Sequence, residues 1–169
     1  MGRRFYLFLF LLGLLITTGA AVLEKSPGYM DADYYYAGAR RIASGQGASE
    51  PYLWNYLNDP AALPAPSFAY WMPLVSLISA VGLRLLPGWG FWGARAPLIL
   101  LAALIPPLTA LLSYRLRRRA DLARLAGILA LFPSFYLAYL PTSDVFALEM
   151  VLGALFFLLV APPGAVTSY

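Results

Sequence analysis

Long apolar runs constrain the fold of this chain more than any other feature of its sequence. They cover residues 5–22, 68–86, 94–114, 122–140 and 145–161. An α-helix rises about 1.5 Å per residue, so a run of this length crosses much or all of a hydrocarbon core of roughly 30 Å. Hydrophobic residues make up 61% of the chain and charged residues only 12%, whereas roughly 25% is usual in soluble domains. The sequence therefore predicts an all-α, polytopic transmembrane helix bundle.

The arginines indicate how many of these runs cross. Arg3 and Arg4 precede the first run, and a second basic group surrounds the end of the third: Arg115, Arg117, Arg118, Arg119 and Arg124. Cytoplasmic loops are rich in Lys and Arg. Five crossings would put the two basic groups on opposite sides, whereas both are cytoplasmic if residues 68–86 do not cross. We therefore predict a cytoplasmic N-terminus and four spans, at 5–22, 94–114, 122–140 and 145–161.

A cleaved signal peptide is the alternative for residues 5–22. The run is longer than the apolar core of most signal peptides, and further spans follow it, which favours a retained helix. After the fourth span, residues 162–169 form a short tail.

The first external loop, residues 24–93, is expected to lie along the membrane surface. In residues 32–44, Tyr35 and Ala39 share one helical face. Residues 68–86 carry an apolar stripe opposite a face with Ser76 and Ser79, as in a helix that lies in the interface with its apolar side toward lipid. Aromatic residues, which prefer this interface, are frequent in the loop: Tyr34, Tyr35, Tyr36, Tyr52, Trp54, Tyr56, Tyr70 and Trp71. We expect two interfacial helices.

The composition also limits the chemistry. The chain has no Cys and no His, which excludes disulfides, zinc fingers and haem ligation by His. A metal would have to be held by oxygen atoms, which suits hard cations such as Mg²⁺ or Mn²⁺. The net charge of +4 does not indicate nucleic acid, because no basic stripe alternates with stacking aromatic residues. The bilayer is the expected partner.

Carboxylates gather on the predicted external side, among them Asp31, Asp33 and Asp144. Asp31 and Asp33 open the first interfacial helix, and Asp144 precedes the fourth span, so bundle packing could bring these sites together. Two such carboxylates could hold a divalent cation and take a proton from an acceptor hydroxyl. The alternative is that Asp31 and Asp144 are helix N-caps, a position that Asp favours. The spacing leaves both interpretations open.

Three further charged residues have two interpretations each. Arg95, at the outer end of the second span, could contact a phosphate in bidentate fashion or could be an interfacial anchor. Arg40 carries the same pair of alternatives. Glu149 lies within the fourth span, where an ionisable group is costly and indicates function, although it is close enough to the end to reach water.

Several short motifs, taken in order, resemble membrane glycosyltransferases of the GT-C fold, in particular the group with protein O-mannosyltransferases and the lipid A aminoarabinose transferase. Asp31, Tyr34, Tyr35, Ala39-Arg40 and Gly45 follow the pattern of the first external loop in that family. Tyr70-Trp71-Met72-Pro73-Leu74 is similar to its proline-containing interfacial helix, and Ala94-Arg95-Ala96-Pro97 to the opening of its second span. The basic turn Arg117-Arg118-Arg119 and the turn Thr142-Ser143-Asp144 complete the series.

The resemblance implies transfer of a sugar from a polyprenyl-phosphate donor to a lipid or protein acceptor on the non-cytoplasmic side of a bacterial plasma membrane. By position, Asp31 would be the catalytic or metal-holding carboxylate and Asp144 its partner. Ala32 stands where many members have Glu, so Asp33 is a substitute candidate. Arg40 and Arg95 would contact the donor phosphate. Family members have eight or more spans, so the resemblance implies the N-terminal portion of a longer enzyme.

Two other classes of function fit the residues. The chain could be a small non-catalytic membrane subunit or assembly protein whose external acids cap helices. It could also be part of a transporter, with Glu149 on an ion path.

Overall fold

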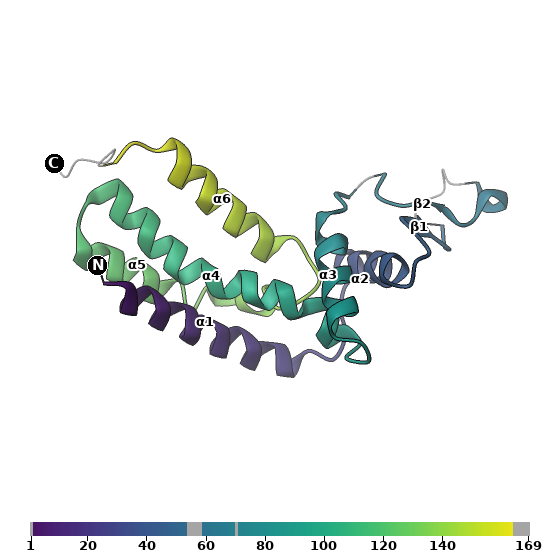
Figure 1. Cartoon of the computed structure of the whole chain (residues 1–169), viewed down its shortest axis with the longest axis horizontal. Helices are drawn as coiled ribbons and strands as arrows, with labels where there is room; N and C mark the ends of the chain where they lie inside the picture. Colours follow the sequence, from purple (N-terminus) through teal and green to yellow (C-terminus); the bar gives the residue numbers. More distant parts are fainter. Residues whose placement is uncertain (1, 54–58, 70, 164–169) are drawn as a thin grey trace.

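The computed structural model describes residues 2–53, 59–69 and 71–163, and it is helical apart from one short hairpin (Figure 1). Trp54, Tyr56 and Tyr70 of the predicted aromatic group lie outside the described residues. The α-helices are α1 (Arg3–Leu23), α2 (Met30–Ala43), α3 (Leu74–Leu85), α4 (Phe91–Arg117), α5 (Ala120–Leu129) and α6 (Phe146–Val160). Two 3₁₀ turns, η1 (Pro60–Ala62) and η2 (Ser134–Ala138), and two strands, β1 (Ser49–Glu50) and β2 (Ala65–Pro66), complete the order. The strands pair antiparallel, with Ser49 opposite Pro66. The predicted all-α class is confirmed.

Two helices in the described part of the chain, α1 and α4, are long and apolar enough to cross a membrane. They contain 21 and 27 residues, or roughly 32 and 40 Å of helix. Both expose large apolar side chains, among them Leu7 and Leu15 of α1 and Leu100 of α4. Pro106 and Pro107 lie inside α4, which continues through both.

The other two predicted spans differ from single long helices. Residues 122–140 are helical only to Leu129 and resume as η2, because Pro133 interrupts the hydrogen-bond ladder and Ser134 has a φ of 57°. The 15 residues of α6 cover roughly 22 Å. The structure therefore shows a helical protein with two candidate spans, and a four-span bundle remains a prediction.

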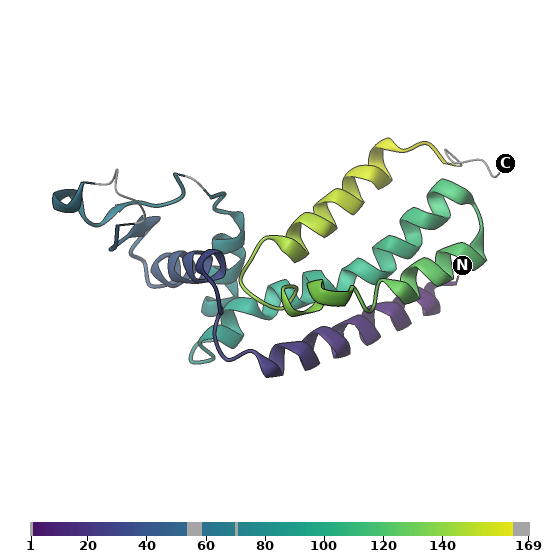
Figure 2. The same ribbon diagram turned by 180° about the vertical axis from the view of Figure 1, so that it is seen from behind.

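The helices that form the elongated part of the molecule alternate in direction (Figures 1 and 2). The N-terminus, the turn between α4 and α5, and the C-terminal end of α6 lie at one end. At that end the Nε of Arg115 donates to the carbonyl of Ala161 at 3.0 Å. The opposite end carries α2, α3 and the loop before α6. The basic groups at the start of α1 and after α4 thus share one end, which is the arrangement that the charge pattern predicts.

Small residues let the helices of this bundle approach closely. A Cβ on Gly13 of α1 would lie 3.3 Å from the carbonyl oxygen of Ala103, a carbonyl that Pro107 cannot bond because it has no N–H. A Cβ on Gly127 of α5 would lie 2.9 Å from the Cβ of Ala110. Small residues at such crossings are typical of helix packing in membranes.

The helix α3 lies across the end of the bundle (Figure 1) with its polar face inward. Ser76 and Ser79 are fully buried, whereas Leu77, Val81 and Leu85 are exposed. With 12 residues, α3 is too short to cross a bilayer. α3 thus has the polar and apolar faces that the sequence predicts for residues 68–86, and contact of its apolar face with lipid remains a prediction.

A cluster of buried side chains joins the bundle to this outer end. Its members come from α2, α3, α4 and α6: Tyr34, Tyr35, Val75, Leu98 and Leu148. Tyr35 and Ala39, which share one face of α2, are both buried. The cluster fixes the start of α2 against the start of α6, where the predicted carboxylates lie.

Candidate functional site

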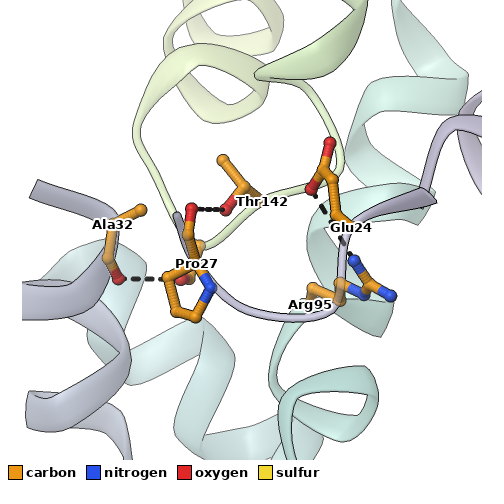
Figure 3. Close-up of polar contacts among 6 residues, drawn as sticks. Glu24, Pro27, Ala32, Arg95 and Thr142 are labelled. Carbon is orange, nitrogen blue, oxygen red and sulfur yellow. Dashed lines mark hydrogen bonds and ion pairs between the residues drawn. The ribbon is translucent and has the colours of Figure 1, made fainter. Parts of the chain in front are cut away.

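The turn that precedes α6 is bound to the start of α2 by two buried hydroxyl groups. Thr142 Oγ1 donates to the carbonyl of Pro27 at 3.2 Å, and Ser143 Oγ donates to the carbonyl of Ala32 at 2.8 Å (Figure 3). Both hydroxyls are buried, where an unmade hydrogen bond would cost about 1–3 kcal/mol. More than 100 residues of sequence separate the two segments, so these bonds define how the helices meet.

Asp144 follows directly in this turn and is 4% exposed. One of its carboxylate oxygens, Oδ2, accepts the hydroxyl of Tyr29, and the other, Oδ1, accepts the backbone N–H of Val145 at 2.6 Å. Burial raises the pKa of the Asp144 carboxyl above its ordinary value, although these two hydrogen bonds oppose the shift. Asp144 is therefore a buried, oriented carboxylate with a raised pKa.

Asp31 lies close enough to Asp144 for its charge to raise the Asp144 pKa further. It sits in the first turn of α2 and is half-buried. The N-cap position of α2 is Tyr29, and no side chain caps it, so Asp31 does not act as the N-cap. Its position in the first turn still suits the helix dipole. We call Asp31 and Asp144 the acid pair.

The third predicted carboxylate, Asp33, lies on a different part of α2. It is exposed and lines a hollow with Met30 and Tyr52. No interaction with Asp144 is found for it in the described structure. The preceding residue, Ala32, is fully buried, and its carbonyl accepts the hydrogen bond from the Ser143 hydroxyl.

Tyr35 lies close to three acidic side chains, Asp31, Asp144 and Glu149. It is 1% exposed, and burial together with the charges of Asp144, Asp31 and Glu149 raises its pKa to about 12. The phenol therefore stays neutral at physiological pH. Its environment shows that Glu149, the acid predicted within the fourth span, faces the same region as the acid pair.

Arg95, one of the two arginines predicted to contact phosphate, is completely buried at the start of α4. Its guanidinium carbon lies 3.8 Å from the ring centre of Trp92 and 4.6 Å from that of Phe91. Its Nη1 lies 3.7 Å from a carboxylate oxygen of Glu24 (Figure 3), and none of its nitrogen atoms makes a hydrogen bond within the described structure. Burial raises the pKa of Glu24 to about 7, against the opposing charge of Arg95.

Arg40, the other predicted phosphate contact, is exposed near the end of α2, with its guanidinium 5.9 Å from the ring centre of Tyr36. Nine residues of helix place it roughly 14 Å along the axis from Asp31. The structure therefore brings Asp31 and Asp144 together, but it brings neither Arg40 nor Arg95 into contact with them.

A divalent cation is the expected cofactor, and the acid pair gives it a limited donor set. No group of three or more Asp, Glu, His or Cys side chains converges anywhere in the described ranges. Both oxygens of Asp144 already accept one hydrogen bond each. Two carboxylates with water and a substrate phosphate fit the usual coordination of Mg²⁺ in enzymes, so the residues suit a shared ion better than a permanent site.

Two hollows adjoin the acid pair. A groove of about 380 Å³ is lined by residues 24–29 together with Ala138, Tyr139 and Thr142. A smaller hollow of about 180 Å³ lies between α3 and α6, and we call it the apolar hollow. Its lining is Met72, Leu74, Val75, Val145, Leu148, Glu149 and Leu152. The groove includes Tyr29, the hydrogen-bond partner of Asp144, and the apolar hollow includes Val145, the residue after Asp144.

Two residues of this site were not predicted from the sequence. Nothing in the sequence marks Tyr29 as the donor to Asp144, because 115 positions separate them. Glu24 did carry a signal. It ends the first apolar run, Arg95 begins the next predicted span, and antiparallel neighbours place such ends side by side.

Comparisons of the chain with family models, with curated proteins and with solved structures found no match.

Proposed function

We propose that this chain is part of a membrane glycosyltransferase that moves a sugar from a polyprenyl-phosphate donor to an acceptor on the non-cytoplasmic side. One observation carries the proposal. The hydroxyls of Thr142 and Ser143 bind the turn before α6 to the start of α2, so that Asp144 lies within electrostatic range of Asp31. The two acids are the carboxylates that the resemblance to GT-C enzymes pairs.

The roles of the two acids follow from their burial. Asp31 is half-buried and can be reached by an acceptor, so it acts as the base. It takes the proton of the acceptor hydroxyl while that oxygen bonds to the anomeric carbon. The bond from this carbon to the phosphate oxygen breaks, and the lipid phosphate leaves with the electron pair. Asp144 is buried and held by Tyr29, so it keeps a fixed position beside Asp31. Mg²⁺, when bound, would offset the charge of the leaving phosphate.

The apolar hollow supports a lipid-linked donor. It begins at Val145, the residue after Asp144, and apart from Glu149 its lining is apolar. An isoprenoid chain in this hollow would keep its phosphate near the outer surface, beside the acid pair. The four predicted spans, with the acid pair at the end opposite the arginine-rich turn, belong to the same proposal.

The test is sugar transfer by the complete protein in membranes that contain each variant at equal abundance. We expect Asp31→Asn and Asp144→Asn each to lower transfer at least a hundredfold, as removal of a general base typically does. Asp59→Asn is the matched control, because Asp59 is an exposed acid of the same loop and Asn can still cap η1. Full activity of both acid-pair variants would remove the enzyme assignment. Loss in Asp33→Asn with retention in Asp31→Asn would move the base to Asp33.

A transporter is the second candidate, and the position of Glu149 favours it. An ionisable side chain that lines an otherwise apolar hollow is a recognised feature of ion paths. In that case Glu149→Gln would abolish substrate flux in reconstituted vesicles, while Asp31→Asn would leave flux unchanged. Unchanged flux in Glu149→Gln would exclude this alternative.

A further inference from the structure

A polar hollow at the far end of α2 is separate from the acid pair. It has a volume of about 410 Å³, within the range of small-molecule sites. We call it the arginine pocket, after its polar lining: Arg40, Arg41, Ser44, Gln46 and Tyr52. It lies between the last turn of α2 and the segment around β1, which contributes Gln46, Pro51 and Tyr52. No carboxylate is among the described residues that line it.

Arginines at a helix C-terminus often bind the free carbonyl groups there, but other groups do so in α2. The backbone N–H groups of Ser44, Gly45 and Gln46 bond the carbonyls of Arg40, Ile42 and Arg41, respectively. Arg84 of α3 adds two bonds of 3.2 Å, to the carbonyls of Ile42 and Ala43. The guanidinium groups of Arg40 and Arg41 are therefore not needed to cap the helix.

The two arginines also lack acidic partners. The ion pairs found in the described residues are Arg95 with Glu24 and Arg119 with Asp121. Arg41 is oriented by Ser49, whose Oγ accepts from Nε at 3.0 Å and from Nη2 at 2.9 Å. Arg40 stands over the ring of Tyr36. Two acids lie near the pocket: Glu50 follows Ser49 in β1 and is buried, and Asp33 lines an adjacent hollow that shares Ala37 and Tyr52 with the arginine pocket. Neither acid forms an ion pair with Arg40 or Arg41 among the described residues.

We propose that the arginine pocket binds a phosphate monoester. Two guanidinium groups match its double negative charge, and their N–H groups form paired hydrogen bonds to phosphate oxygens. The Gln46 amide and the Tyr52 hydroxyl supply further donors. The volume leaves room for the group that carries the phosphate. A cation or a neutral sugar would leave two positive charges in the pocket without a partner.

This site does not depend on the proposed sugar transfer. Arg40 lies roughly 14 Å along α2 from Asp31, so a ligand can occupy the arginine pocket without contacting the acid pair. The Asp144→Asn variant should therefore bind phosphate like the unmodified chain, even if it has lost transfer.

The experiment is a binding titration of the full chain in detergent. The probes are inorganic phosphate and short-chain phosphatidic acid, with short-chain phosphatidylcholine as a blank because its phosphate is a diester. We expect Arg40→Ala and Arg41→Ala each to weaken binding about tenfold or more, since hydrogen bonds to charged groups contribute about 1.5–3 kcal/mol. Arg124→Ala is the matched control, because it removes one exposed positive charge from α5. Arg41→Lys should bind more tightly than Arg41→Ala but less tightly than the unmodified chain, since Lys keeps the positive charge but lacks the paired N–H donors of a guanidinium group.

The outcomes separate the sources of the phosphate. Binding of inorganic phosphate points to a soluble ligand, and binding of phosphatidic acid alone points to a lipid headgroup. Binding of neither probe by the unmodified chain would overturn the proposal. So would an equal loss in Arg124→Ala, which would mean attraction to net charge, or undiminished binding in both Arg40→Ala and Arg41→Ala.

Discussion

At the scale of single residues, the carboxylates of Asp144 and Glu24 differ in how they are held. Asp144 accepts hydrogen bonds on both oxygens, whereas Glu24 faces Arg95 at 3.7 Å and has a buried oxygen without a hydrogen bond. Burial raises the pKa of both carboxyl groups. At Asp144 two hydrogen bonds oppose the shift, whereas at Glu24 the charge of Arg95 opposes it.

Loss of the Tyr29 hydroxyl should weaken the fold at the acid pair. In Tyr29→Phe the ring remains, but Asp144 loses a donor in a buried place, and a hydrogen bond to a charged group contributes about 1.5–3 kcal/mol. We expect a loss of stability of that size in thermal or denaturant unfolding. Tyr139→Phe is the control, because Tyr139 packs edge-on against Tyr29 and none of the hydrogen bonds found in the described structure involves its hydroxyl. An equal loss in both variants would contradict the importance of the hydroxyl.

The Glu24 carboxyl should make stability fall as the pH rises. Its pKa is about 4.5 when unfolded and about 7 when folded. The folded chain therefore holds the proton more tightly, and this contribution is complete below pH 4.5 and lost as the pH passes 7. We expect the unfolding temperature in detergent to decline between about pH 5 and 7 and then to level off. Glu24→Gln should reduce this slope, whatever its effect on absolute stability, because the raised pKa values of Asp144 and Glu50 leave part of it in place. An unchanged slope would assign the titration to another group.

At the scale of helices, the position of α3 depends on one glycine. A Cβ on Gly82 would lie 2.8 Å from Cδ of Pro97 and would also meet the carbonyl oxygen of Gly93. We expect Gly82→Ala to cost about 1–3 kcal/mol, as overpacking usually does, measured by thermal unfolding in detergent. Gly153→Ala in α6 is the control, because a methyl group added there would meet nothing within 4 Å and Ala favours helix by up to about 1 kcal/mol. A neutral Gly82→Ala would mean that α3 does not pack on α4 in this way.

The sequence predicted the helices well where hydropathy alone determines them. The runs 5–22 and 94–114 became α1 and α4 with ends shifted by a few residues. It failed at 122–140, because hydropathy does not register a lost hydrogen bond and Pro133 divides that run. Pro106 and Pro107 do not divide α4, where Gly13 and Pro106 itself pack the helix against α1. Proline thus ends the helix in one run and lies within a continuous helix in the other, and the tertiary contacts of α4 account for the difference.

At the scale of the whole molecule, the charge pattern predicted which ends of the helices lie together. The N-terminus and the turn after α4 share one end, and the acid pair lies at the other (Figure 1). The meeting of Asp31 and Asp144 was open from the sequence, because the contacts that produce it are hydroxyl-to-carbonyl bonds across more than 100 positions. Those bonds leave no pattern in composition or periodicity.

The membrane orientation can be tested directly because the chain has no Cys of its own. We expect Ala48→Cys, before β1, to react with a membrane-impermeant maleimide in intact cells. Asp121→Cys, in the first turn of α5, should react only after permeabilisation. Both positions are exposed, so accessibility to water does not differ between them. Labelling of both from the same side would contradict the proposed crossings, and labelling of Asp121→Cys alone in intact cells would invert them.

The two hydroxyl contacts before α6 have a consequence for how the sequence can vary. Thr142 and Ser143 bond to main-chain oxygens of residues 27 and 32 and to no side chain there. Substitutions at residues 27 and 32 can therefore accumulate without separating Asp31 from Asp144, provided that the buried methyl group of Ala32 is not replaced by a bulky side chain. Distant descendants of this protein could thus differ at both positions and keep the same spacing between their acids.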